Sequence, residues 1–448
     1  MKRILSWALV LALLAAVCLT GCTKTPASSA APASSAQPAS SAAESKTEPL
    51  KQAKIQVWLL GPGKQIDSEK VWAKVNELLA KTLPNTTVEM SVLASSEYKD
   101  KYNTMLASEE PVDLAWGGYA TNLKQDMLDG NLMELTDLLD KYGPDVKKGI
   151  GDTLLEMNRY DGKLYYLINW QSVYRDRIGI YMPTEFVNLM DSNWLSDTNA
   201  VAAKAINDPT VDNIQAIYDQ MAQYYQKLVD SGKIYGGLDP STFNQDPFFQ
   251  YAGRAMTQNY VGIQYGDDTF TVKNLVDTDA YRLLAKNMAE FYKKGYIASD
   301  IASKKINGWT TQKDGSYDNN TPISLGREAY GDESEKQYSK QFYREVSLVR
   351  IHDIGTIAGG SETCMTIPFC ADEPERAMMF LNEVWKNKEL YQLLIYGIKG
   401  EHYTDNGDGT ITTGYGQIGN SNAKYGIWKW TIGTCLNSLV TEGDIPGY

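Results

Sequence analysis

Hydrophobic and polar residues follow a strand pattern and a helix pattern in turn along the first part of the folded chain. Ile55–Leu60 is a short apolar run that ends at a Gly-Pro-Gly turn. Ser68–Thr82 carries apolar residues at helical spacing, with Ser68 as the expected N-cap. Val88–Leu93 alternates as a second strand, and Glu97–Ser108 is amphipathic. This order predicts a parallel sheet with crossover helices, and therefore an α/β fold.

The next expected strand, DLAWGGY at Asp113–Tyr119, runs directly into a loop. Its two glycines free the backbone and leave room for a ligand to approach closely. Trp116 and Tyr119 place flat rings beside that loop, which suits a sugar, although most Trp residues simply belong to a core. Ligands of parallel sheets bind beyond the carboxyl ends of the strands. We therefore expect a binding site here, with a core position for Trp116 as the alternative.

The remaining pattern is a mixture of helices and short strands. Trp170 and Tyr174 follow a turn at Asp161-Gly162 in polar company, and the hairpin turn DNGDGT lies near residue 408. The segment DPFFQY contains Phe248, for which a helix core is the alternative to a binding role. Further helices are expected at 132–142, 212–230, 278–294, 374–396 and 424–440, and further strands at 178–182, 323–327 and 363–368.

Composition narrows the classes of function. A formal net charge of -12 argues against a nucleic-acid partner, because a phosphate backbone requires a basic surface. The 29 Tyr and 10 Trp against 9 Phe favour rings with a polar group, which suit wet binding sites. The chain has no GxSxG, HExxH or GxxxxGK[ST] motif, so the familiar hydrolase and nucleotide-binding signatures are missing. We expect no enzyme activity and no cofactor.

Cysteine and histidine are too sparse for a structural zinc site. Beyond the N-terminal segment only Cys364, Cys370 and Cys435 remain, with no CxxC pair and two His in the whole chain. We therefore expect no metal. Cys364 and Cys370 could form a disulfide or remain free thiols.

The N-terminus has the pattern of a secretion signal. Lys2 and Arg3 precede an apolar run that is too short to span a membrane as a helix. The sequence LTGC ending at Cys22 resembles the lipobox of bacterial lipoproteins, in which the cysteine carries the lipid (palmitate). The alternative is an ordinary signal peptide cut near the same place. Residues 1–21 are expected to be a signal peptide and residues 22–50 a disordered Ser/Ala/Pro tether.

Several segments in order resemble one family. These segments are DLAWGGY with the following GNLMELTDLLDKYG, the RYDGKLYYL crossover, NGWTTQKDGSYDNNTPISLGREAYG and IAGGSETCMTIPFCADEPERAMMFLNEVWKNKELYQLLIYGIKGEHY. In their order and spacing they are similar to the carbohydrate-type solute-binding proteins of bacterial ABC transporters. Within this family, the sequence most resembles the maltodextrin-binding-like lipoproteins of Gram-positive bacteria. Relatives in this subgroup run on past the position of Tyr448.

This resemblance implies a type II fold of two α/β lobes, joined by a hinge, that close on a ligand in a cleft. The implied lobes are discontinuous. Lobe 1 is expected at residues 51–169 and 356–400, and lobe 2 at residues 170–355 and 401–448.

The resemblance also implies positions for ligand contacts. Trp116 matches a sugar-stacking ring, Phe248 a second aromatic platform, and Trp428 or Trp430 a ring from a late helix. Trp170 stands at the hinge crossing between the lobes, where relatives often carry a polar or acidic ligand contact. Its indole therefore departs from the family pattern. The expected ligand-binding residues are Trp116, Tyr119, Trp170, Tyr174, Phe248, Arg327, Tyr330, Trp428 and Trp430. Trp116→Ala is expected to weaken sugar binding by at least ~1 kcal/mol while the fold stays intact.

The function implied is an extracellular substrate-binding lipoprotein of an ABC importer. It would capture a carbohydrate, an oligosaccharide above all, and deliver it to the permease subunits. Its place would be the extracellular face of the cell membrane, held by the lipid on Cys22. Two alternatives stay open: a surface glycoside hydrolase, which needs paired carboxylates, and a binding protein for a peptide or amino acid.

Overall fold

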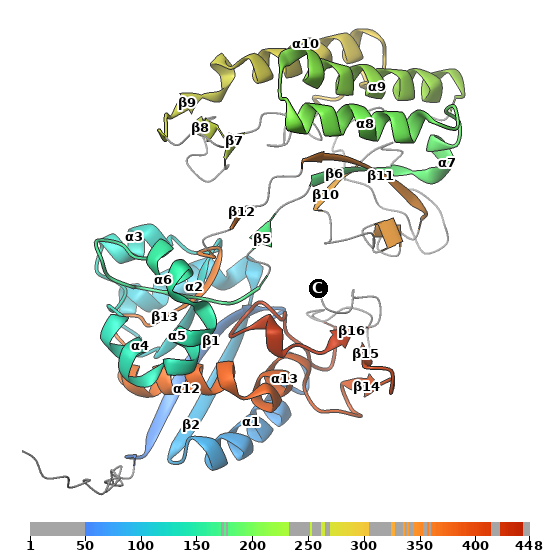
Figure 1. The fold of residues 1–448 in the computed structure, drawn as a ribbon. Helices are drawn as coiled ribbons and strands as arrows, with labels where there is room; N and C mark the ends of the chain where they lie inside the picture. The colour runs from blue at the N-terminus through green and yellow to red at the C-terminus, as the bar shows by residue number, and fades with distance from the viewer. Residues whose placement is uncertain are drawn as a thin grey trace, which may run out of the picture. The chain divides into compact units, whose positions relative to one another are not determined.

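Two buried hydrophobic cores organise the chain in a computed structural model. Figure 1 shows the helices and strands that contribute to them. One contains residues from Ile55 to Ile168 and from Met365 to Ile432, and the other residues from Ile180 to Ile351. The structure describes residues 50–171, 174–175, 178–232, 251–252, 261–264, 269–303, 324–327, 335–336, 338–339, 344–352, 356–357, 360–413 and 422–441.

The first core is built on a five-stranded sheet. Its order is β2 (Thr86–Ala94), β1 (Ala53–Gly61), β3 (Leu114–Gly118), β13 (Thr363–Thr366) and β4 (Leu167–Ile168). The first three strands are parallel, as their sequence order predicted. β13 returns from far along the chain and inserts antiparallel between β3 and β4. The sheet therefore joins two distant parts of the sequence.

Helices pack around this sheet with their apolar positions buried. The helices are α1 (Ser68–Thr82), α2 (Ser95–Ser108), α3 (Leu123–Leu128), α4 (Thr136–Tyr142), α5 (Pro144–Ile150), α6 (Asp152–Met157), α12 (Pro374–Lys386) and α13 (Lys388–Tyr396). In α1 the buried residues include Val71, Val75 and Leu79, which the helical spacing predicted. Ser68 is not the N-cap. It is the first helical residue, and its Oγ accepts a hydrogen bond from the backbone N–H of Gln65 (2.9 Å).

The second core lies between a small antiparallel sheet and a set of helices. The sheet has the order β10 (Ser324–Arg327), β6 (Ile178–Pro183) and β11 (Val346–His352). The helices are α7 (Thr184–Val187), α8 (Trp194–Asn207), α9 (Val211–Asp230) and α10 (Asp279–Lys293), with a 3-10 turn η3 (Leu275–Asp277) before α10. A second antiparallel sheet contains β7 (Tyr251–Ala252), β8 (Val261–Gln264) and β9 (Lys273–Asn274).

A short antiparallel ribbon belongs to the crossing between these two parts of the sequence. It pairs β5 (Tyr174–Arg175) with β12 (Thr356–Ile357). β5 follows β4 along the chain, and β12 precedes β13. The chain therefore leaves the first sheet after β4 and returns to it at β13, and these two strands are neighbours in the sheet.

The C-terminal segment packs on the first core. Ile411, Tyr425, Ile427 and Ile432 are buried members of that cluster. The assignment of this tail to lobe 2 is therefore wrong for its described residues, because burial of these side chains requires the first sheet and its helices. The elements of the tail are β14 (Tyr403–Asp405), β15 (Thr410–Thr413), a 3-10 turn η4 (Cys435–Asn437) and β16 (Val440–Thr441).

Two local predictions for this tail had different outcomes. The hairpin turn at DNGDGT is confirmed, since β14 and β15 pair antiparallel across it. The helix expected at 424–440 is wrong: this stretch contains turns, η4 and the start of β16. Tyr425, Ile427 and Ile432 of this stretch are buried in the first core without belonging to a helix. Among the described residues, no helix combines the length and the apolar character that crossing a membrane requires.

Candidate functional site

The carboxyl end of β3 is the place where several chain segments meet. β1 ends beside it at Gly61, and β13 begins beside it at Thr363. At this point the backbone of Glu362 lies close to Gly118. A Cβ added to Gly118 would lie only 2.0 Å from the carbonyl oxygen of Glu362. Gly118 has a φ of +139°, a region that favours glycine. The glycine thus makes room for the protein's own returning strand, whereas the sequence suggested room for a ligand.

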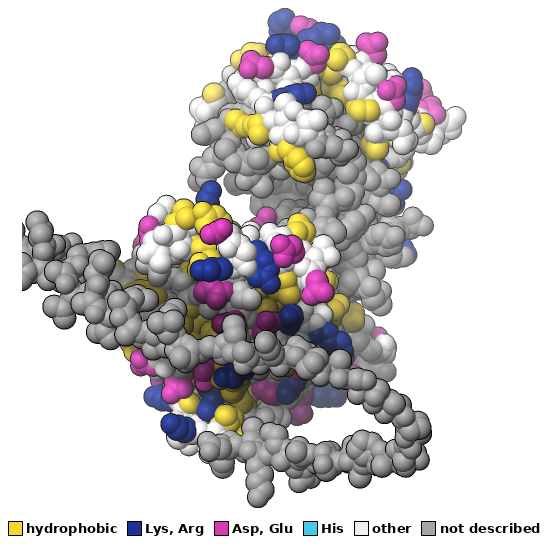
Figure 2. Space-filling view, turned by 60° about the vertical axis from the view of Figure 1, so that its left-hand side comes forward, with side chains coloured by type: hydrophobic (Ala, Val, Ile, Leu, Met, Phe, Trp, Pro, Cys, Tyr) yellow, Lys and Arg dark blue, Asp and Glu magenta, His cyan; other side chains and the backbone are white. Residues whose placement is uncertain are grey.

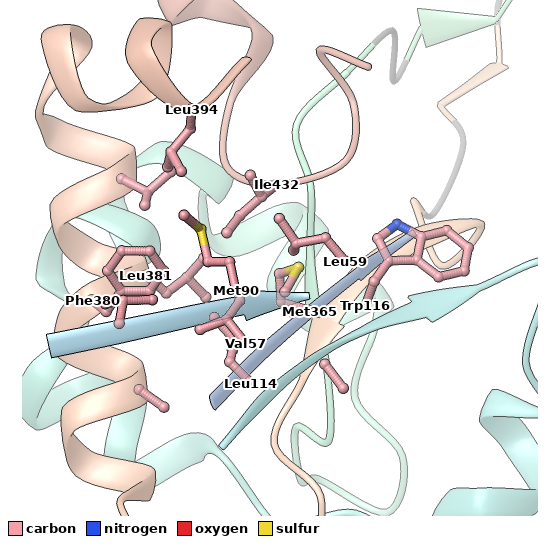
Figure 3. Packing of buried hydrophobic residues seen from close by; sticks show 14 of the residues in the cluster. Val57, Leu59, Met90, Leu114, Trp116, Met365, Phe380, Leu381, Leu394 and Ile432 are labelled. Atoms are coloured by element: carbon pink, nitrogen blue, oxygen red, sulfur yellow. The ribbon is translucent and has the colours of Figure 1, made fainter. Parts of the chain in front are cut away.

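Trp116 is buried behind this end of the sheet rather than exposed. Its side chain is 0% exposed and belongs to the first core. Figure 3 shows its indole at the margin of the cluster, beyond Leu59 and Met365. The ring of Tyr98 meets it edge-on at 5.6 Å, and the Tyr98 hydroxyl donates to the Trp116 carbonyl oxygen (2.7 Å). The expected stacking of a sugar on a free face of Trp116 is therefore wrong in this structure, and the core alternative describes its position.

The accessible rings at this site are Tyr119, Trp430 and Trp428. Tyr119 is 61% exposed, and its ring centroid lies 5.2 Å from that of Trp116 and 6.2 Å from that of Trp430. Trp430 is half-buried and stacks on Trp428 at 4.9 Å with an interplanar angle of 10°. We call Tyr119, Trp428 and Trp430 the edge aromatics. Trp116 supports them from behind, with its ring centroid 6.4 Å from that of Trp430.

The hydroxyl of Tyr119 gives this cluster a polar group. Partial burial raises the pKa of Tyr119, and a hydrogen bond with Ser95 acts in the opposite direction. The phenol is therefore neutral at physiological pH and can donate and accept hydrogen bonds. Apolar ring faces beside a neutral hydroxyl match the surface of a sugar, which presents C–H groups and hydroxyls.

Asp113, at the start of the same motif, is used for structure. It is 1% exposed. Its two carboxylate oxygens accept hydrogen bonds from the backbone N–H groups of Gln56 (2.8 Å) and Glu373 (2.7 Å). Burial raises its pKa, against the effect of these bonds. Its oxygens therefore join β1 and the start of α12 to β3.

Trp170 lies beside the C-terminal segment. Its backbone N–H donates to the carbonyl of Gly433 (2.8 Å), and its carbonyl accepts from the N–H of Cys435 (2.8 Å). The half-buried side chain packs against the first core. The structure thus brings Trp170 into the same tail that carries Trp428 and Trp430.

The other expected contacts are not placed at this site. Tyr174 lies in β5 and Arg327 at the end of β10, where only the backbone is described. Phe248, Tyr330 and Cys22 lie outside the described residues. Cys364 and Cys370, for which a disulfide was one option, are free thiols.

Residues that support the site were missed in the sequence. Tyr98 on α2 buttresses Trp116, and Asn169 binds the tail through its amide. Neither belongs to a motif. Their roles depend on contacts with residues up to 264 positions away, for which the local pattern carries no signal.

Acidic and basic side chains are interspersed over the described surface shown in Figure 2. Many form exposed ion pairs, such as Lys64 with Glu69 and Lys399 with Asp405. Such pairs contribute little to stability. The negative net charge therefore does not produce a uniformly acidic face in this view.

Comparisons with known proteins agree on the fold. No protein-family model matches the sequence. A carbohydrate ABC transporter substrate-binding protein of Streptococcus pneumoniae serotype 4 is 21% identical over 357 residues, which cover 77% of this chain and 62% of the relative. The chain thus spans less than two-thirds of that relative's length.

Solved structures of solute-binding proteins also resemble this chain. The crystal structure of the N-glycan transport solute binding protein from Streptococcus pneumoniae superposes with a TM-score of 0.66 at 16% identity, covering 88% of this chain and 80% of the other. The same protein in complex with Man1GlcNAc gives a TM-score of 0.59 at 15% identity, with the same coverage. The chain therefore has the two-lobe, type II α/β fold of extracellular solute-binding proteins, and the fold expected from the sequence is confirmed.

Proposed function

We propose that this chain is the substrate-binding component of an ABC importer and that it captures an oligosaccharide. The observation that carries the proposal is the set of edge aromatics at the carboxyl end of β3, in a chain with a solute-binding fold. The similarity to a carbohydrate ABC transporter substrate-binding protein supports the same class of ligand.

The chemistry of the edge aromatics favours a carbohydrate over a peptide. A pyranose can place its C–H face on Tyr119 or Trp430, while its hydroxyls bond to the Tyr119 hydroxyl and to water. No charged side chain is needed for such a contact. A free amino acid would require partners for its ammonium and carboxylate groups. The two stacked Trp rings extend the apolar surface, which suits more than one sugar unit.

Ligand capture would follow from hinge closure. The ribbon of β5 and β12 leads into the first sheet, and few backbone pairs hold it. A short ribbon of this kind can absorb changes in backbone dihedral angles. The closed, loaded protein would then be the form that the permease subunits bind.

Membrane attachment would come from the lipid on Cys22. The support is in the sequence: a basic start, an apolar run and LTGC, followed by a Ser/Ala/Pro tether. The tether would leave the folded part free at the extracellular face of the membrane. Cys22→Ala should release the protein from the membrane fraction and abolish incorporation of labelled palmitate. Retention of the variant in membranes would contradict this anchor.

One experiment separates the proposed function from its rivals. Purified protein is titrated calorimetrically with Man1GlcNAc, maltotriose and a tripeptide, and each mixture is then analysed for cleaved products. Saturable binding of either sugar without cleavage supports the proposal. Sugar cleavage would identify a glycoside hydrolase, and binding of the tripeptide alone would identify a peptide-binding protein. The double variant Tyr119→Ala/Trp430→Ala should bind the same sugar much more weakly.

A further inference from the structure

Asn169 is a buried amide between the first sheet and the C-terminal segment. It follows β4 directly and is 1% exposed. Its Nδ2 donates to the carbonyl of Thr431 (2.8 Å), and its Oδ1 accepts from the N–H of Gly433 (3.2 Å). Both bonds are buried and cross more than 260 residues of sequence. A buried amide bonded at both ends holds its partners in one register.

Further hydrogen bonds join the sheet to the C-terminal segment on both sides of the Asn169 contacts; we call this contact region the junction. The N–H of Asn169 donates to the carbonyl of Thr363 in β13 (3.0 Å). Trp170 and Thr434 form a parallel bridge. The hydroxyl of Thr431 donates to the carbonyl of Leu60 near the end of β1 (3.2 Å). The segment 431–435 therefore lies against the sheet at the point where the chain leaves β4 for β5.

Trp430 is joined to this junction by one peptide bond. The position of its ring beside Tyr119, and of Trp428 stacked on it, depends on where the backbone of Thr431 is held. Lys429 and Trp430 lie in a turn, in which the N–H of Thr431 donates to the carbonyl of Trp428 (3.0 Å). The hydroxyl of Tyr391 donates to the carbonyl of Lys429 (2.5 Å), so Tyr391 holds the backbone before Trp430 and Asn169 holds it after. Apart from the amide of Asn169, no side chain donates to the Thr431 carbonyl among the described residues.

We propose that Asn169 is a positioning residue for the edge aromatics. It holds the Thr431–Gly433 backbone so that Trp428 and Trp430 stay stacked beside Tyr119 before any ligand arrives. Preorganised rings bind a sugar without the cost of ordering a loop. The ligand in this statement rests on the proposed function, whereas the positioning of the rings does not.

The test variant is Asn169→Leu, which keeps a similar size and leaves the Thr431 carbonyl and the Gly433 N–H unpaired. A matched control is Asn382→Leu. Asn382 is 6% exposed and also joins distant segments, because its Oδ1 accepts from the N–H of Asp145 (2.7 Å) and its Nδ2 donates to the Asp145 carboxylate (2.9 Å). A general loss of stability should appear in both variants.

The primary measurement is the near-ultraviolet circular dichroism of the Trp428–Trp430 stack in protein without ligand. Its contribution is the difference between the natural sequence and Trp428→Phe. We expect Asn169→Leu to lose at least about half of that signal and Asn382→Leu to keep it, since stacked rings couple only in a fixed geometry. Equal retention in both variants would show that Asn169 is merely structural and would overturn the proposal.

Affinity for Man1GlcNAc and maltotriose is the second measurement. For a sugar that binds, Asn169→Leu should weaken binding about threefold to tenfold, the equivalent of one aromatic contact, and Asn382→Leu should not. If neither sugar binds the natural protein, the proposed ligand fails while the dichroism still decides the positioning role. If Asn169→Leu does not fold, Asn169→Asp replaces it: its carboxylate still accepts from Gly433 but cannot donate to Thr431, so a partial loss of the stack signal is expected and an unchanged signal contradicts the proposal.

Discussion

Two groups of aromatic rings in this protein have similar geometry and different surroundings. The edge aromatics include the Trp428–Trp430 stack, with centroids 4.9 Å apart. The second core contains a comparable stack of Trp194 on Tyr224, at 5.5 Å and an interplanar angle of 19°, which continues through Tyr225. The second group is buried, with Trp194 6% and both tyrosines 0% exposed, whereas Tyr119 is 61% exposed.

The difference shows that clustered rings do not identify a sugar site by themselves. The rings of the second core come from α8 and α9, where helical spacing turns them toward one interior. The edge aromatics come from a loop after a strand and from a tail more than 300 residues later, and they meet at a sheet edge. The rings on α8 and α9 stabilise a core, whereas the edge aromatics remain open to a ligand.

The largest effect is expected for Trp116→Ala, because this ring belongs to the core and also supports the edge aromatics. Loss of a fully buried Trp should lower the free energy of unfolding by about 3–5 kcal/mol. Sugar affinity should fall as well, since Tyr119 and Trp430 lose their support. Urea unfolding and calorimetric titration measure the two effects. A fully stable variant with lost affinity would restore the original expectation of an exposed stacking ring.

Trp194→Ala should be similarly destabilising but should leave binding unchanged. Its indole is buried against Tyr224 in the second core, so its removal should cost about 3–5 kcal/mol of unfolding free energy. Affinity measured on the folded fraction, at a temperature well below the transition, should equal that of the natural protein. A lower affinity would place this ring group in the binding function and end the contrast between the two groups.

Trp430→Ala should reverse that pattern. The ring is half-buried, so stability should change little, while sugar affinity should weaken by about 0.5–1.5 kcal/mol, the usual contribution of an aromatic contact. Trp430→Phe is the matched control and should retain most of the affinity, because a flat apolar face remains. Unchanged calorimetric affinity in Trp430→Ala would remove the main support for the edge aromatics as a binding site.

The smallest effect concerns titration of the tyrosines. Burial raises the pKa of Tyr119 and raises the pKa values of Tyr224 and Tyr225 much further. Above about pH 10 an unfolded chain gives up these phenolic protons, while the native state keeps those of Tyr224 and Tyr225. Their contribution to stability is therefore complete below that pH and is lost as the pH rises.

Phenolate absorbance during an alkaline titration can separate the two groups. Tyr119 should ionise reversibly and before Tyr224 and Tyr225, and Tyr119→Phe should lower the amplitude of the reversible component by the equivalent of one of the 29 tyrosines. Tyr224 and Tyr225 should ionise only together with loss of the far-ultraviolet dichroism. Ionisation of all tyrosines in one step with unfolding would show that Tyr119 is as enclosed as the second core.

The first half of the sheet was predictable because its information is local. Each strand and helix from Ile55 to Ser108 carries its own period, and crossover rules then order the strands as parallel neighbours. The insertion of β13 between β3 and β4 was not predicted, since no local pattern links Met365 to Trp116. The C-terminal tail was assigned to the wrong lobe for the same reason: its apolar residues carry no period that indicates which core buries them.

By itself, the sequence determined the order of strands and helices from Ile55 to Ser108, the hairpin turn at DNGDGT, and the presence of rings at a strand end. Only the tertiary structure decided which of those rings is accessible. Trp116 and Tyr119 are three residues apart, yet Tyr98 from α2 and Trp430 from the tail enclose the first, while the second remains 61% exposed. Exposure is set by what other segments cover, and those segments reach β3 only when the whole sheet has formed.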